Sequence, residues 1–176
     1  MGKKIILWNT GGIKTKIKRD IKIERIRNLI EKPEEIFFII LQETHWTTKD
    51  DEPTDLTNHD NLFEIRNSYA STNDSWSGIT AIVNKIHSIT EFHEIIKGRL
   101  VHIKLEHKTS KEITNIFTYY GYQQNKTNEN KMDFHIDLAN LKINNEKLEN
   151  IIYLGDFNYV THKIDRNNQE SKYDRK

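Results

Sequence analysis

The sequence predicts an α/β protein, built as a mixed sheet or as a two-sheet sandwich with helices outside. Three short apolar runs, at residues 5–8, 36–41 and 151–154, are rich in β-branched and aromatic side chains, as in strands buried on both faces. A stretch with helical spacing separates the first two runs, and a series of strand-like segments separates the second from the third. This order indicates a β-α-β start, antiparallel strands and a final α-β unit.

The first part of the chain predicts a strand at 3–8, which ends at Asn9, and a turn at Gly11 and Gly12. Isoleucine and leucine then recur at helical spacing, at Ile13, Ile17, Ile21, Ile26, Leu29 and Ile30. Pro33 lies just past the expected helix end. The strand at 36–41 completes a β-α-β unit, so we expect its two strands to be parallel.

The remaining elements follow from patterning. Residues 47–61 are polar and contain Pro53, so we expect a loop. Strands are expected at 62–69, 78–84, 86–96, 100–106 and 112–120, with clear alternation in the fourth. A polar loop at 123–131, a helix at about 131–148 and the strand at 151–154 follow. We assign residues 1–160 to one domain and the polar residues 161–176 to a tail or loop.

Composition narrows the function classes. The 176 residues carry a net charge of +1. They include no cysteine, and this absence excludes a disulfide framework and a thiolate zinc site. We expect an intracellular protein, in the cytoplasm or nucleus, because no signal-peptide pattern and no apolar run long enough to span a bilayer is present. Basic residues predominate at 3–32 and acidic residues at 43–64. Solvated surface is the simpler interpretation, and the functional one is a basic surface for a phosphate backbone beside an acidic rim for a cation.

Polar side chains follow each of the three apolar strands directly. They are Asn9, then Gln42, Glu43, Thr44 and His45, and finally Asp156 and Asn158. Because ligands bind at the carboxyl ends of strands in open α/β sheets, these groups can be aimed at one point. The pattern suggests a site for a divalent cation and a phosphate.

Each candidate residue has a functional and a simpler interpretation. Glu43 fits a ligand for Mg²⁺, which prefers hard oxygen ligands, and Asp156 with Asn158 fits a pair that positions a phosphate or a nucleophile. The simpler interpretations are that Glu43 is a solvated carboxylate, Asn9 a turn residue before glycine, and His45 an exposed structural side chain.

In this order the motifs resemble the endonuclease/exonuclease/phosphatase superfamily, and most closely the apurinic-type endonuclease domain of non-LTR (LINE-like) retrotransposons. The residues that carry the resemblance are Trp8-Asn9, Leu41-Gln42-Glu43-Thr44-His45, Ser77-Gly78-Ile79 with Ala81-Ile82, Gly98-Arg99, Asn115-Ile116-Phe117, Gly155-Asp156-Phe157-Asn158 and Asp165-Arg166. The resemblance implies a four-layered α/β sandwich of two mixed sheets flanked by helices. It also implies a phosphodiesterase that nicks DNA with Mg²⁺, or with Mn²⁺ as the alternative metal.

The resemblance further implies roles for individual residues. Asn9 and Glu43 would lie on the metal side, Asp156 would orient the attacking water, and Asn158 would hold the phosphate. The residues implied to contact the DNA substrate are His45, Arg99, Asn115 and Arg166. The family usually has tyrosine where this chain has Phe117. We therefore expect Tyr119, two residues on and on the same strand face, to supply the catalytic hydroxyl.

The family continues past its Asp-Arg pair to a Ser-Asp-His motif that supplies a catalytic histidine, and no such motif follows Arg166. We therefore expect the amino-terminal portion of such a domain, incomplete at the C-terminus, with little nuclease activity alone and with self-association through unpaired strands. Two alternatives stay open. One is a catalytically inactive remnant that binds nucleic acid or protein, and the other is a phosphatase of the same superfamily.

Overall fold

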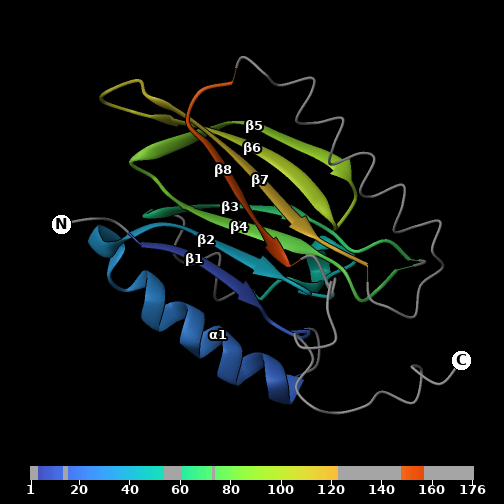
Figure 1. Cartoon of the computed structure of the whole chain (residues 1–176). Helices are drawn as coiled ribbons and strands as arrows, with labels where there is room; N and C mark the ends of the chain where they lie inside the picture. Colours follow the sequence, from blue (N-terminus) through green and yellow to red (C-terminus); the bar gives the residue numbers. More distant parts are fainter. Residues whose placement is uncertain (1–3, 14–15, 54–60, 73, 123–147, 157–176) are drawn as a thin grey trace, which may run out of the picture.

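The computed structural model describes residues 4–13, 16–53, 61–72, 74–122 and 148–156. Its main elements are β1 (Lys4–Asn9), α1 (Lys16–Ile30), β2 (Ile36–Gln42), β3 (Phe63–Ser68), β4 (Ile79–Asn84), β5 (His87–Ile96), β6 (Leu100–His107), β7 (Ile113–Tyr120) and β8 (Ile151–Asp156) (Figure 1). Every strand that the sequence predicts within these residues is present. The predicted helix at 131–148 and the predicted tail at 161–176 lie outside the described residues.

Two mixed four-stranded sheets form the described part of the chain. The first has the order β1-β2-β4-β3, and the second has the order β5-β6-β7-β8. β1 pairs with β2 in parallel, as the β-α-β pattern predicts, and β7 pairs with β8 in parallel. The other neighbours are antiparallel. The sheets stack face to face, and α1 covers the outer face of the first (Figure 1). The predicted α/β sandwich is confirmed.

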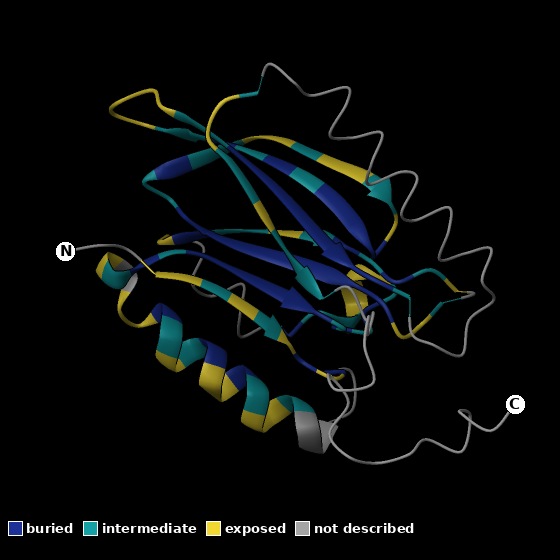
Figure 2. Ribbon diagram, in the orientation of Figure 1, coloured by how far each residue is buried: buried dark blue, intermediate teal, exposed yellow. Residues whose placement is uncertain are grey.

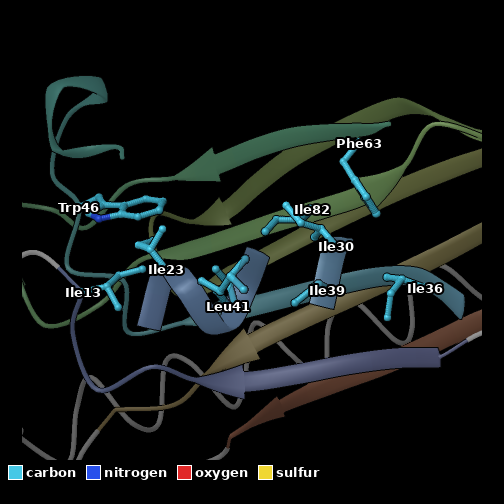
Figure 3. Packing of buried hydrophobic residues seen from close by; sticks show 10 residues of the cluster. Ile13, Ile23, Ile30, Ile36, Ile39, Leu41, Trp46, Phe63 and Ile82 are labelled. Atoms are coloured by element: carbon cyan, nitrogen blue, oxygen red, sulfur yellow. The ribbon is translucent and has the colours of Figure 1, made fainter. Parts of the chain in front are cut away.

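β2 connects two hydrophobic cores because its side chains alternate between the faces of the first sheet. Ile39 and Leu41 pack beneath α1, together with Ile23, Ile26 and Ile30 of the helix (Figure 3). Phe38 and Ile40 point the other way and pack against β4, β6 and β7 of the second sheet. The prediction that this strand is buried on both faces is therefore correct.

The predicted helix face is correct at Ile26, Leu29 and Ile30, which pack into the core, and wrong at Ile21. Ile21 was expected among the inward residues, but its exposed fraction is 56%. The continuous pattern from Ile13 does not hold, because Ile13 is buried ahead of α1, which begins at Lys16. The stripe that reaches the core is Ile23, Ile26 and Ile30, and Ile21 lies on the opposite side of the helix.

β1 and β8 are also less buried than predicted, because both are edge strands among the described residues (Figure 2). Ile5 and Leu7 of β1 are 41% and 38% exposed, and Tyr153 of β8 is 44% exposed. An edge strand has a neighbour on one side only, so its outer side chains lose cover. Their carboxyl ends nevertheless reach the same region as the end of β2. Within the described residues, no helix is long and apolar enough to cross a membrane.

Candidate active site

The segment that follows β2 leaves the sheet in an unusual backbone conformation. Glu43 and His45 have positive φ values of 54° and 61°, in the left-handed region that non-glycine residues seldom adopt. Backbone hydrogen bonds hold the segment from both sides. Gly12 N–H donates to the Glu43 carbonyl at 2.8 Å, and His45 N–H donates to the Ser77 carbonyl at 3.0 Å. Two loops thus fix the direction of the Glu43 side chain.

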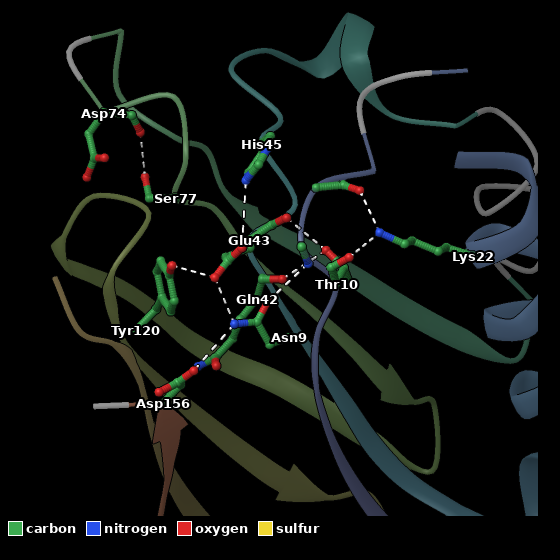
Figure 4. Close-up of polar contacts among 12 residues, drawn as sticks. Asn9, Thr10, Lys22, Gln42, Glu43, His45, Asp74, Ser77, Tyr120 and Asp156 are labelled. Carbon is green, nitrogen blue, oxygen red and sulfur yellow. Dashed lines mark hydrogen bonds and ion pairs between the residues drawn. The ribbon is translucent and has the colours of Figure 1, made fainter. Parts of the chain in front are cut away.

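The Glu43 carboxylate is the centre of the site (Figure 4). Its Oε1 accepts hydrogen bonds from Asn9 Nδ2 at 2.8 Å and from the Tyr120 hydroxyl at 2.5 Å. Its Oε2 lies 4.0 Å from His45 Nε2, and the side chain is 14% exposed. One oxygen is therefore held by neutral donors, and the carboxylate keeps a small solvent-exposed surface.

Asp156 joins this group from the second sheet. It ends β8, which runs parallel to β7, and its Oδ2 lies 3.4 Å from Asn9 Nδ2. Gly121 N–H donates to the Asp156 carbonyl at 2.7 Å and fixes the end of the strand. The structure thus brings Asn9, Glu43 and Asp156 together at one rim of the sandwich. Asn158 and Arg166 lie outside the described residues.

His45 lies between Glu43 and two residues that limit its movement. Burial lowers the pKa of His45, and the nearby Glu43 charge opposes that shift only in part. Its ring makes an edge contact with Trp76, with centroids 5.2 Å apart. On another side it presses on Gly12, which has a φ of 84° and where an added Cβ would lie 2.6 Å from His45 Nδ1. A side chain at residue 12 would displace the imidazole.

The hydroxyl at Glu43 belongs to Tyr120, which sequence reasoning missed. Side chains alternate along β7, so Tyr120 faces the first sheet, whereas Phe117 and Tyr119 face outward. Phe117 stacks between the rings of His102 and Tyr153, at 4.5 and 5.3 Å. The sequence signal that could have found Tyr120 is the alternation of side chains along the strand, because a shift of one position moves a tyrosine to the other face of the sheet.

Tyr119 lies on the outer face near the end of β8. Burial, and secondarily the charge of Asp156, raises the pKa of Tyr119. Its ring packs on Gly155, where an added Cβ would lie 2.4 Å from Tyr119 Cδ2. Tyr119 is therefore close to Asp156, while the Tyr120 hydroxyl donates a hydrogen bond to Glu43.

Arg99 is 2% exposed, and its Nε and one terminal nitrogen donate hydrogen bonds to protein groups. Its Nε donates to Asp74 Oδ2 at 2.5 Å, and one terminal nitrogen donates to the carbonyls of Tyr120 and Gly121 at 3.0 and 2.9 Å. The guanidinium also stacks on the rings of Tyr120 and Tyr122. These contacts make Arg99 a residue that positions Tyr120.

Asn115 lies far from Glu43. It is 2% exposed, and it is separated from Tyr120 by roughly 16 Å of strand at about 3.3 Å per residue. Its Oδ1 pairs with His102 Nε2 at 3.1 Å, and its Nδ2 donates to the Glu149 carbonyl at 3.0 Å. These contacts fit a structural role at the start of β7, and the structure does not bring Asn115 into the site.

The residues present fit a magnesium-type ion better than zinc. Among the described residues, no three His, Cys, Asp or Glu side chains form a metal cluster. Mg²⁺ commonly uses one or two carboxylates plus water and substrate phosphate, so Glu43, with Asp156 nearby, is a suitable donor set. Asn9 Oδ1 accepts the Gly11 N–H at 3.0 Å. Ligation through that oxygen would require Asn9 to give up this bond.

Comparison with known proteins adds the fold. No protein-family model and no curated protein matches the chain. Solved structures do match. TDP2 of D. rerio, complexed with single strand DNA product, is 16% identical with a TM-score of 0.63, and the match covers 89% of this chain and 60% of that chain. The 3' phosphatase NExo from Neisseria, bound to product DNA hairpin, is 13% identical with a TM-score of 0.64, covering 91% and 60%.

A third match is the AP endonuclease LMAP from Leishmania major, which is 14% identical with a TM-score of 0.59, covering 88% of this chain and 54% of that chain. The chain thus spans less than two thirds of the length of each of these three structures. At such identities a likeness describes the backbone arrangement alone. The chain therefore has the fold of the endonuclease/exonuclease/phosphatase superfamily.

Proposed function

We propose that this chain carries the metal side of the active site of a divalent-metal-dependent phosphodiesterase that nicks DNA, of the retrotransposon endonuclease type. The observation that carries the proposal is the Glu43 carboxylate, hydrogen-bonded to Asn9 and Tyr120, with Asp156 on the same Asn9 amide. Neighbours of the same fold with DNA in their structures support DNA as the substrate.

Each residue has a defined task in this proposal. Glu43 would hold Mg²⁺, which when bound would polarise a phosphoryl oxygen and stabilise the leaving oxygen. Asp156 would accept a hydrogen bond from the attacking water and orient it. Asn9 would keep the two carboxylates in register through its shared amide. The Tyr120 hydroxyl, which now donates to Glu43, would donate to a phosphate oxygen as negative charge develops there.

A phosphatase acting on nucleic-acid ends is the second candidate. The same carboxylates would serve a terminal phosphate, and one neighbour is a 3' phosphatase with a DNA hairpin. Which phosphate is cleaved separates the two candidates. A nicking enzyme opens supercoiled plasmid, whereas a phosphatase releases inorganic phosphate from a 3'-phosphorylated strand and leaves the plasmid closed.

The test measures metal binding and hydrolysis on the same purified chain. Mn²⁺ serves as a paramagnetic substitute for Mg²⁺, and free Mn²⁺ is counted by electron paramagnetic resonance. We expect weak binding that Glu43→Gln abolishes, because the substitution removes the charged oxygen ligand and little volume. We expect slow nicking of supercoiled plasmid in Mg²⁺ that the same variant abolishes.

Glu91→Gln is the matched control. Glu91 is a surface carboxylate on β5, away from the site, and it pairs with Lys104 of β6. It should leave Mn²⁺ binding and nicking unchanged. Mn²⁺ binding that survives Glu43→Gln, or tight zinc binding indifferent to Glu43, would contradict the proposed function. Phosphate release without nicking would replace the leading candidate by the phosphatase.

A further inference from the structure

Trp76 is an unusually exposed aromatic side chain. Its exposed fraction is 65%, the highest of any large apolar residue in the described part of the chain. By contrast, Trp46 is 1% exposed, within the core beneath α1. Leaving an indole in water forgoes the free energy that its burial would provide. Tryptophan is enriched where a partner covers it, because the ring offers a large rigid contact surface.

The loop that carries Trp76 is anchored, so the indole is held in place. Asp74, two residues before it, binds the buried Arg99 guanidinium at 2.5 Å. Ser77, directly after it, donates its amide and its hydroxyl to the Asp74 carbonyl at 3.2 and 2.9 Å. The Ser77 carbonyl also accepts the His45 N–H. A ligand that covers the indole would therefore lose little freedom in ordering this loop.

The position of the indole connects it to the candidate active site. It meets His45 edge to face at a centroid separation of 5.2 Å, and His45 Nε2 lies 4.0 Å from Glu43 Oε2. His45 thus contacts both Trp76 and the carboxylate that would hold the metal. A phosphate bound at Glu43 would place its own neighbouring groups over this loop.

We propose that Trp76 is a stacking platform for the nucleobase next to the scissile phosphate, so that the substrate is a nucleic-acid strand with an unpaired base at that point. The inference rests on the proposed function and names its substrate class. Of the groups joined to phosphate esters, a nucleobase has the flat π-face that an exposed indole recognises. A base inside a duplex already has both faces stacked, so the base at Trp76 belongs to a single strand, an end or a flipped nucleotide.

The magnitude is measurable. Base–aromatic stacking changes affinity by about 5- to 150-fold per base, and it tolerates any base sequence. The effect should be separable from phosphate contacts, which depend on the backbone and on salt. A strand with all its phosphates and no bases is therefore the informative ligand.

The experiment compares oligothymidine with an abasic tetrahydrofuran strand of equal length, both titrated by fluorescence anisotropy in Ca²⁺ to prevent cleavage. We expect the unaltered chain to bind the thymidine strand at least 5-fold more tightly, in line with the range of about 5- to 150-fold above. In Trp76→Ala this ratio should fall to near unity, and Trp76→Phe should restore part of it. Leu62→Ala, which also removes an exposed apolar side chain, should keep the full ratio.

Intrinsic fluorescence provides an independent readout. Oligothymidine should quench the emission of the unaltered chain, and the quenched component should be missing in Trp76→Phe. Equal affinity for the two strands, or a base preference that survives Trp76→Ala, would overturn the inference. If Mn²⁺ binding at Glu43 persists in that case, the proposed function stands without it. An unaltered chain that binds neither Mn²⁺ nor either strand would overturn both the inference and the proposed function.

Discussion

Replacing Arg99 by methionine removes a buried cation while keeping most of the side-chain volume. The guanidinium donates hydrogen bonds to three acceptors, which are the Asp74 carboxylate and the carbonyls of Tyr120 and Gly121. The side chains of Arg99 and Asp74 are only 3% and 15% exposed. In Arg99→Met the Asp74 carboxylate would stay in the protein without its partner.

The expected cost follows from that uncompensated charge. Removing one partner of a buried ion pair typically costs about 3–5 kcal/mol. A domain of ordinary stability has about 5–15 kcal/mol in total, so the variant would lose a large part of it. With a urea m-value of about 2 kcal/mol/M, the unfolding midpoint should fall by about 2 M.

Urea unfolding followed by circular dichroism measures this change. The cycle of Arg99→Met, Asp74→Asn and the double variant isolates the pair, and the double variant should be more stable than Arg99→Met alone. Arg66→Met is the matched control, because Arg66 pairs with Glu64 at the surface and should cost less than about 1 kcal/mol. An Arg99→Met protein as stable as the original, but weaker in DNA binding, would refute the positioning role and restore the substrate contact that the motif implied.

Three further predictions concern strand packing, pH and association. Gly155→Ala should destabilise the chain by about 1–3 kcal/mol in urea unfolding, because the added Cβ would lie 2.1 Å from the Tyr119 carbonyl oxygen. Acidification from pH 7 to 5 should lower stability, and His102→Gln should reduce that loss. Burial lowers the pKa of folded His102, so the unfolded chain takes up a proton first and stability falls by at most about 1.4 kcal/mol per pH unit. A midpoint that does not change with pH would contradict this. We also propose that the chain self-associates through its edge strands, so Leu7→Glu on β1 should shift size-exclusion elution toward the monomer, whereas Ile21→Glu on α1 should not.

The fold was largely predictable because strand signals are local. β2 is an unbroken apolar run. In strands such as β6, the alternation of apolar and polar residues indicates which face of the strand is the less buried one. What the sequence could not supply was the position of each strand in its sheet. β1 and β8 have apolar runs like that of β2, yet they lie at edges of the described sheets, and strand order is a long-range property.

The candidate site was predictable where polar residues end a strand, as at Asn9, Glu43 and Asp156. Two residues show why the rest was not. Tyr120 was missed because the family motif placed the tyrosine at Phe117, and Tyr119 was chosen as the nearest tyrosine on the same strand face. A shift of one residue, to Tyr120, reaches the opposite face of the sheet. The family resemblance implied a substrate contact for Arg99. Its ion pair with Asp74 could not be foreseen, because the two residues are distant in sequence and come close only through the packing of two loops.

The left-handed backbone at Glu43 and His45 has a consequence for how this protein tolerates change. Such a conformation costs a non-glycine residue about 1–2 kcal/mol, and glycine or asparagine adopts it more readily. A library selected only for expression or heat resistance should therefore accumulate glycine or asparagine at these two positions. It would discard the carboxylate and the imidazole while improving the fold. Directed evolution of this chain needs a chemical readout alongside a stability readout, because the two select opposite residues in the same short segment.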